Sequence, residues 1–103
     1  MNESIVEWAR QQKTGSAAEK VTLAVLAFRA GFYGERRWTP ELLARETDQP
    51  LALVAERLKE LEALGLIAVT VAPRIAGARR TIVVLHDEGA RAFARQLRGT
   101  APA

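Results

Sequence analysis

The sequence predicts one mainly α-helical domain with a small β-hairpin, an α+β fold. The chain has 103 residues, which is the size of one ordinary domain. Its 49% hydrophobic and 26% charged residues can build a core and exclude a wholly disordered chain. Apolar residues recur mostly at helical spacing, whereas β-branched runs occur near residues 66–72 and 80–86. We expect residues 1–98 to form the domain and residues 99–103 a flexible tail.

Two helices are expected in the first third of the chain. Residues 3–13 alternate apolar and charged side chains at helical spacing, which predicts a short amphipathic helix. Ser16 and Glu19 have the spacing of a capping box, so a second helix begins there. That helix is apolar on nearly every side from residue 17 to about residue 33. We therefore expect it to run through the core until the glycines at 31 and 34 end it.

The next segment predicts two helices joined by a tight turn. Thr39 and Pro40 supply an N-cap and a first-turn proline for a short helix that ends near Thr47. After residues 48–50, apolar residues recur at steps of three and four until Gly65, a suitable C-cap. The face of this fourth helix that we expect to be buried carries Leu51, Val54, Leu58 and Leu61.

A hairpin and a final helix complete the prediction. Residues 66–72 and 80–86 read as strands, residues 73–79 as their connection, and residues 88–98 as an amphipathic helix. This order of elements is that of a winged helix-turn-helix with extra terminal helices. The helix-turn-helix covers about residues 39–65 and the wing about residues 66–86.

Several short segments also carry a family resemblance. They are residues 42–47 (LLARET), Val54, Leu58 and Leu61 before Gly65-Leu66-Ile67, then Arg79-Arg80 and residues 85–89 (LHDEG). On these segments, residues 19–97 resemble bacterial transcriptional regulators of the MarR and PadR type. Residues 20–67, which include Trp38-Thr39-Pro40, are also similar to the winged-helix module of plasmid and phage replication initiators. Both resemblances imply binding to double-stranded DNA.

The charge distribution indicates where a polyanion is expected to bind. The net charge is +3, but residues 1–65 carry a net −1 and residues 66–103 a net +4. Arg74, Arg79 and Arg80 lie in a stretch without a carboxylate, so we expect them to contact DNA phosphates. Further DNA-contacting candidates are the outward residues of the fourth helix and the pair before the third: Ala52, Ala55, Glu56, Lys59, Arg36 and Arg37. Because few of these can reach base edges, we expect modest base readout.

The terminal helices are the expected surface of a homodimer. A two-fold dimer doubles a weak half-site contact with DNA. The interface residues that we expect are Ile5, Trp8, Phe93 and Leu97. The second hairpin strand is apolar on both faces, so it needs a cover, and the first helix is the expected candidate, packed within the protomer or across the two-fold axis.

Other classes of protein lack the residues that they need. The chain has no cysteine and one histidine, His86, which we interpret as a helix-start residue, so we expect no metal site. Neither a phosphate-binding loop nor a nucleophile motif occurs, and we expect neither an enzyme nor a cofactor. The longest strongly apolar stretch, residues 21–28, is too short to span a bilayer, and residues 1–13 lack a secretory pattern, so a cytoplasmic protein is expected.

Two classes of function remain. The first is a homodimeric DNA-binding regulator, with replication of plasmid or phage DNA as a variant. The second is a winged-helix module that binds a protein through the apolar first turn of the fourth helix, which holds Leu51, Ala52 and Leu53.

Overall fold

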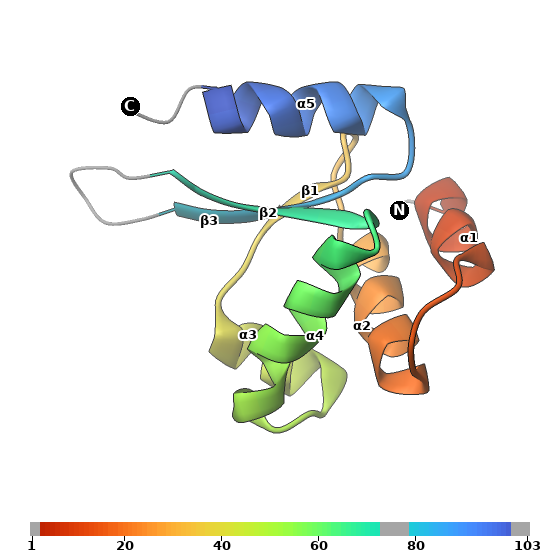
Figure 1. Ribbon diagram of the computed structural model, residues 1–103, viewed down its shortest axis with the longest axis vertical. Coiled ribbons are helices and arrows are strands. Elements are labelled where there is room, and N and C mark those ends of the chain that lie inside the picture. Colours follow the sequence, from red (N-terminus) through yellow and green to blue (C-terminus); the bar gives the residue numbers. More distant parts are fainter. Residues whose placement is uncertain (1–2, 73–78, 100–103) are drawn as a thin grey trace.

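The computed structural model describes residues 3–72 and 79–99 (Figure 1). These residues form five helices and a three-stranded antiparallel sheet, which confirms the α+β class. The elements are α1 (Glu3–Gln11), α2 (Ala17–Phe28), β1 (Glu35–Arg37), α3 (Pro40–Thr47), α4 (Leu51–Ala63), β2 (Ile67–Ala72), β3 (Arg79–Val84) and α5 (Glu88–Gly99).

The predicted helix ends have the bonds that their sequences indicate. The Ser16 hydroxyl accepts a hydrogen bond from the Glu19 backbone at 3.2 Å, and the Glu19 carboxylate accepts one from the Gly15 backbone at 2.8 Å. Thr39 caps α3 by accepting from the Leu42 backbone at 3.1 Å. Gly65 follows the end of α4 with φ at 77°, a left-handed conformation that favours glycine.

The sheet contains one strand more than the sequence predicted. Its order is β1-β3-β2, and β1 pairs with β3 so that Arg36 lies opposite Ile82. Gly34 makes this pairing fit, because its φ is 81° and its carbonyl accepts from the Val84 backbone at 2.8 Å. A Cβ at Gly34 would collide with the Val84 carbonyl oxygen, so a larger residue would displace the strand.

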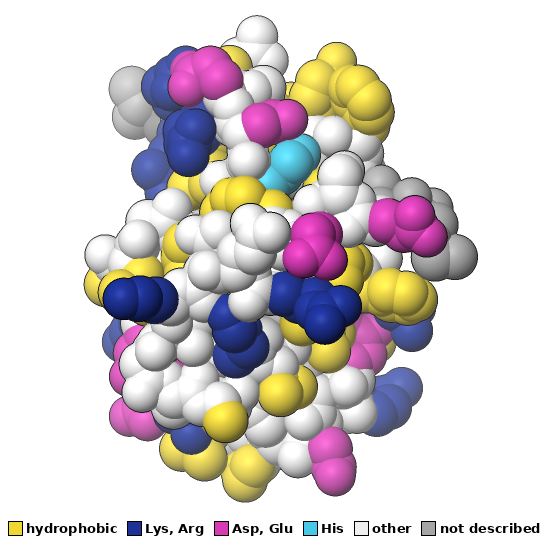
Figure 2. Space-filling view, turned by 90° about the vertical axis from the view of Figure 1, so that its right-hand side faces the viewer, with side chains coloured by type: hydrophobic (Ala, Val, Ile, Leu, Met, Phe, Trp, Pro, Cys, Tyr) yellow, Lys and Arg dark blue, Asp and Glu magenta, His cyan; other side chains and the backbone are white. Residues whose placement is uncertain are grey.

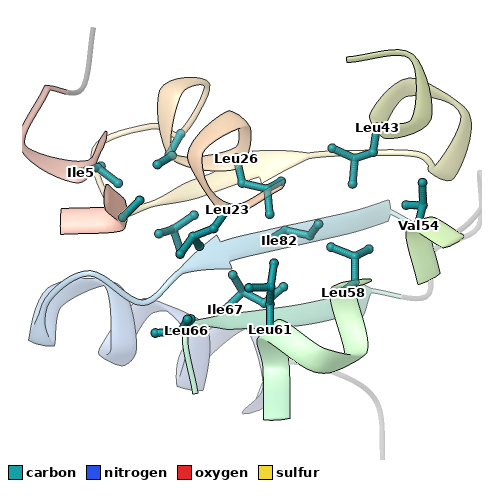
Figure 3. Packing of buried hydrophobic residues seen from close by; sticks show 14 residues of the cluster. Ile5, Leu23, Leu26, Leu43, Val54, Leu58, Leu61, Leu66, Ile67 and Ile82 are labelled. Atoms are coloured by element: carbon teal, nitrogen blue, oxygen red, sulfur yellow. The ribbon is translucent and has the colours of Figure 1, made fainter. Parts of the chain in front are cut away.

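Helices cover both faces of the sheet (Figure 1). On one face, α1, α2, α3 and α4 build the larger core with β3 and the start of β2. Figure 3 shows Leu23 of α2, Leu61 of α4 and Ile82 of β3 converging there, and each is fully buried. Burial of each such side chain stabilises the fold by about 1.5–3 kcal/mol.

The other face of the sheet is covered by α5. Ala68 and Val83 pack against Ala90 and Ala94, with Phe93 and Leu97 partly buried beside them. Within the protomer, α5 and not the first helix therefore covers this face, which corrects that part of the expectation. Instead, α1 packs on α2 and contributes Ile5 and Ala9 to the larger core.

The second helix is shorter and more exposed than predicted. It ends at Phe28, not near residue 33, and Val21 and Phe28 are 48% and 55% exposed. The chain then turns through residues 29–34 into β1. Only one side of α2 therefore faces the core. Among the described helices, none has the length and apolar character needed to cross a membrane.

Candidate nucleic-acid interface

The outward face of α4 is open to solvent. Ala52, Ala55, Glu56 and Lys59 are all exposed, while Val54, Leu58 and Leu61 are buried. The placement of Leu51 in the core is wrong: this side chain is 51% exposed, because α4 begins there, one turn before the first buried position. The first turn of α4 thus presents an apolar surface.

Several charged side chains at the edges of α4 form ion pairs. Arg57 pairs with Glu60 at 3.5 Å, and the neighbouring Glu19 carboxyl on α2 raises the pKa of Glu60 through a hydrogen bond. Glu62 accepts hydrogen bonds from the Val69 backbone at 3.1 Å and from Arg98 at 3.2 Å. Within the described ranges, Lys59 has no carboxylate at ion-pair distance, so its ammonium group can reach a phosphate.

The two arginines before α3 have different roles. Arg36 makes a two-pronged ion pair with Glu46 of α3, with nitrogen–oxygen distances of 2.7 and 3.3 Å. The two side chains are only 9% and 13% exposed, and the Arg36 hydrogen bond is the main cause that lowers the pKa of Glu46. The prediction that Arg36 contacts DNA is therefore wrong. Strand alternation turns Arg37 to the opposite face, where it is exposed.

Arg80 lies at the base of the hairpin beside Trp38. Its guanidinium carbon is 5.9 Å from the centre of the Trp38 ring, and the Trp38 backbone donates to the Arg80 carbonyl at 3.2 Å. The side chain of Arg80 is exposed, as a phosphate contact requires. Arg74 and the side chain of Arg79 lie outside the residues that the structure describes, so the structure does not locate their predicted contacts with DNA.

The candidate DNA surface, formed by the outward face of α4 and the hairpin, lies away from α1. In Figure 1 the outer ends of β2 and β3 and the helix α3 lie to the left, whereas α1 lies to the right. Figure 2 views the α1 side, where basic, acidic and hydrophobic side chains are intermixed. That side carries no extensive field of one sign, which makes it a poorer candidate for a polyanion.

The predicted dimer residues differ in how far the fold buries them. Ile5 is 3% exposed and belongs to the core, so the prediction that it lies at a dimer interface is wrong. Trp8 is partly buried against the same core. Phe93 and Leu97 are partly buried on α5, and Phe93 stacks on Tyr33 with ring centres 5.3 Å apart.

Sequence reasoning missed an exposed aromatic edge, which is formed by Phe32 and Tyr33. Phe32 is 82% exposed and meets Tyr33 edge to face at 5.0 Å. Both line a cavity of about 470 Å³ with Trp8 and His86. The glycines on either side of Phe32 and Tyr33 were the available signal that these rings lie in a loop and not in the buried helix.

Among the described residues, the remaining polar groups do not form a metal site. His86 bonds locally, with Nε2 3.2 Å from the Asp87 carboxylate and Nδ1 3.2 Å from the Val84 carbonyl. Across residues 3–72 and 79–99, no group of three or more His, Asp or Glu side chains could hold a metal ion.

No protein-family model, curated protein or solved structure matches this chain.

Proposed function

We propose that this chain is a winged helix-turn-helix protein that binds duplex DNA as a homodimer and regulates transcription. The observation that carries the proposal is the arrangement of α2, β1, α3, α4, β2 and β3. Two helices joined by residues 48–50 precede a hairpin, and the sheet order is β1-β3-β2. In a winged helix the second of these helices enters the major groove and the hairpin reaches the backbone or minor groove.

The outward face of α4 is the proposed reading surface. It spans 13 residues, or roughly 20 Å, and none of the described residues covers its exposed side. Lys59 supplies a cation for a phosphate, and Glu56 can accept from the amino group of cytosine. Ala52 and Ala55 allow close approach but offer no polar contact to a base edge. Specificity is therefore expected to be modest and to depend on DNA shape.

Phosphate contacts supply most of the affinity in this proposal. Arg37 and Arg80 are exposed on adjacent strands, and the register places them on opposite faces of the sheet, because Arg37 lies opposite Thr81, the residue after Arg80. The sequence places Arg74 and Arg79 near Arg80, and we expect them to add phosphate contacts. One guanidinium group can donate two hydrogen bonds to the oxygens of one phosphate. Because each neutralised phosphate releases counterions, DNA affinity is expected to fall steeply as the salt concentration rises.

The homodimer is proposed to form at the aromatic edge. Phe32 projects beside the cavity of about 470 Å³ that it lines with Trp8 and Tyr33. A two-fold axis at this edge brings the same patch of both protomers together, so each Phe32 ring can enter the other cavity. Dimerisation would remove these exposed rings from water and double the DNA contacts.

A second candidate function is supported by the first turn of α4. Leu51 is 51% exposed and Leu53 half-buried, and the small side chain of Ala52 lies between them. Apolar groups at the start of a helix that would otherwise read DNA suit a protein partner. The alternative is thus a winged-helix module that binds a protein through the same surface.

Two substitutions separate these candidates. Lys59→Glu reverses an exposed charge and is expected to weaken DNA binding in a folded protein. Leu51→Asp places a charge on the exposed apolar turn and is expected to change DNA affinity less than Lys59→Glu does. Anisotropy titrations with duplex DNA, with circular dichroism as the folding control, measure both. Full DNA affinity in folded Lys59→Glu, or no binding by the parent protein, would favour the interaction module.

A further inference from the structure

Three aromatic rings line the cavity of about 470 Å³ where α1, residues 29–34 and the connection from β3 to α5 meet (Figure 1). Trp8 comes from α1, and Phe32 and Tyr33 come from the loop before β1. Phe32 and Tyr33 are 82% and 46% exposed, and Trp8 is half-buried. The rings therefore offer aromatic surface to a ligand, and the volume of the cavity is within the range of small-molecule sites.

The arrangement of the rings suits a positively charged ligand. The ring planes of Phe32 and Tyr33 are nearly perpendicular, at 84°, with their centres 5.0 Å apart. Phe93 stacks on Tyr33 with ring centres 5.3 Å apart, which holds that ring in place. The faces of aromatic rings carry negative potential, so rings that surround a cavity attract a cation.

The charge of the lining has the sign that favours a cation. Among the described residues that line the cavity, Asp87 supplies the one carboxylate, and there is neither lysine nor arginine. This carboxylate is 59% exposed; Oδ1 accepts from the Ala90 backbone at 2.8 Å, and Oδ2 lies 3.2 Å from Nε2 of His86. A neutral imidazole adds no charge. An anion would meet both the carboxylate and the negative ring faces, so the lining selects against it.

We propose that this cavity binds a small organic cation that carries a quaternary ammonium group. The methyl groups of such a cation pack against the ring faces while its charge lies near the Asp87 carboxylate. A primary ammonium ion fits less well, because it loses hydrogen bonds to water that aromatic walls do not replace.

One consequence rests on the proposed dimer. In that dimer the partner's Phe32 enters the same cavity, so a bound cation and the dimer exclude one another. An organic cation would then shift the protein toward the monomer and weaken DNA binding by removing the second set of contacts. The binding of the cation itself depends neither on the dimer nor on DNA.

Choline and a neutral analogue test the proposal. In the analogue, dimethylbutanol, a carbon atom replaces the charged nitrogen. NMR titrations measure both affinities at a protein concentration where sedimentation shows the monomer, and at about pH 8, where histidine side chains in general are neutral. We expect the analogue to bind at least about tenfold more weakly, and the choline methyl protons to shift upfield through the ring currents. Equal affinities, or no binding of choline, would overturn the proposal. A trimethyllysine peptide that binds much more tightly than choline would contradict a small-molecule ligand.

Protein variants with matched controls locate the site. Asp87→Asn removes the charge but keeps a side chain that can cap α5, and it is expected to weaken choline binding about fivefold without changing dimethylbutanol binding. Glu88→Gln removes a neighbouring carboxylate outside the cavity lining and is expected to have little effect. Phe32→Leu is expected to weaken choline binding about threefold, whereas Phe28→Leu changes an exposed ring outside the cavity and is not. Equal losses in a variant and its control, with folding checked by circular dichroism, would contradict the proposal.

Sedimentation separates this inference from the proposed dimer. Excess choline is expected to shift the parent protein from dimer to monomer. Choline that binds by NMR without this shift would support the cation site and contradict the dimer interface. A dimer that forms through Phe32 in a protein that does not bind choline would contradict the cation site alone.

Discussion

Adjacent arginines on β1 are expected to respond in opposite ways to the same substitution. Arg36→Gln removes one partner of the ion pair with Glu46, leaving a carboxylate whose side chain is 13% exposed. Breaking a fully buried pair costs about 3–5 kcal/mol, and breaking an exposed pair costs less than about 1 kcal/mol. Arg29 still lies 3.7 Å from Glu46, which compensates in part. We expect a loss of about 2 kcal/mol in the free energy of unfolding, and a melting temperature lower by roughly 10 °C.

Arg37→Gln is the matched control. Arg37 is exposed, so its replacement is expected to change the free energy of unfolding by less than about 0.5 kcal/mol. It is expected instead to weaken DNA binding and to reduce its salt dependence, because the lost guanidinium group faces solvent. Urea unfolding followed by circular dichroism measures the first effect, and anisotropy with duplex DNA the second. Equal stability losses in Arg36→Gln and Arg37→Gln would refute the assignment.

The contribution of Arg36 to the free energy of unfolding also depends on pH, and the direction follows from the lowered pKa of Glu46. Because Arg36 lowers the pKa of Glu46 from the ordinary value of 4.5, ionised Glu46 contributes stability that is fully present above about that pH. The contribution is lost as pH falls through the lowered pKa of the folded protein. The stability gap between the parent and Arg36→Gln should therefore narrow as pH falls below 4.5. A gap that stays constant to lower pH would contradict this reasoning.

Three further substitutions test the fold and the proposed dimer. Ser16→Ala should cost about 1 kcal/mol in urea unfolding, since it removes the cap of α2, and no loss would exclude a contribution from that cap. Phe93→Ala removes the ring stacked on Tyr33 and partly uncovers the sheet, so we expect a loss of about 2 kcal/mol; an unchanged urea midpoint would show that α5 does not stabilise the sheet through this ring. Phe32→Ser should leave stability nearly unchanged and shift sedimentation from dimer to monomer, and an intact dimer would exclude the aromatic edge as the interface.

The elements with strong local signals were predicted well from sequence. α3 has the Thr39 cap, α4 has regular apolar steps and a glycine after its end, and the hairpin strands are β-branched runs, so their positions follow from short-range patterns. β1 had no such signal, because Glu35, Arg36 and Arg37 are polar and do not alternate. It forms through pairing with β3, which is a long-range contact. A three-residue strand of this kind cannot be inferred from its own residues.

The site was predicted less completely because exposure depends on tertiary contacts. An amphipathic pattern identifies the apolar face of a helix but not the element that covers it, so within the protomer α1 was expected on a sheet face that α5 covers. The Arg36 ion pair joins residues ten positions apart on different elements, and no local pattern separates Arg36 from Arg37. The outward residues of α4 were placed correctly because helical periodicity alone determines which face opposes Val54 and Leu58.

The central claim is that the surface formed by α4 and the hairpin binds duplex DNA, and a salt-dependent titration tests it most directly. Anisotropy of a labelled random duplex is measured against the protein over a series of salt concentrations, for the parent and for Arg80→Gln. We predict binding whose logarithmic affinity falls linearly with logarithmic salt, and a slope reduced by about 0.9 per protomer in Arg80→Gln. Absence of binding by the folded parent at low salt, or an unchanged slope in Arg80→Gln, would contradict the account.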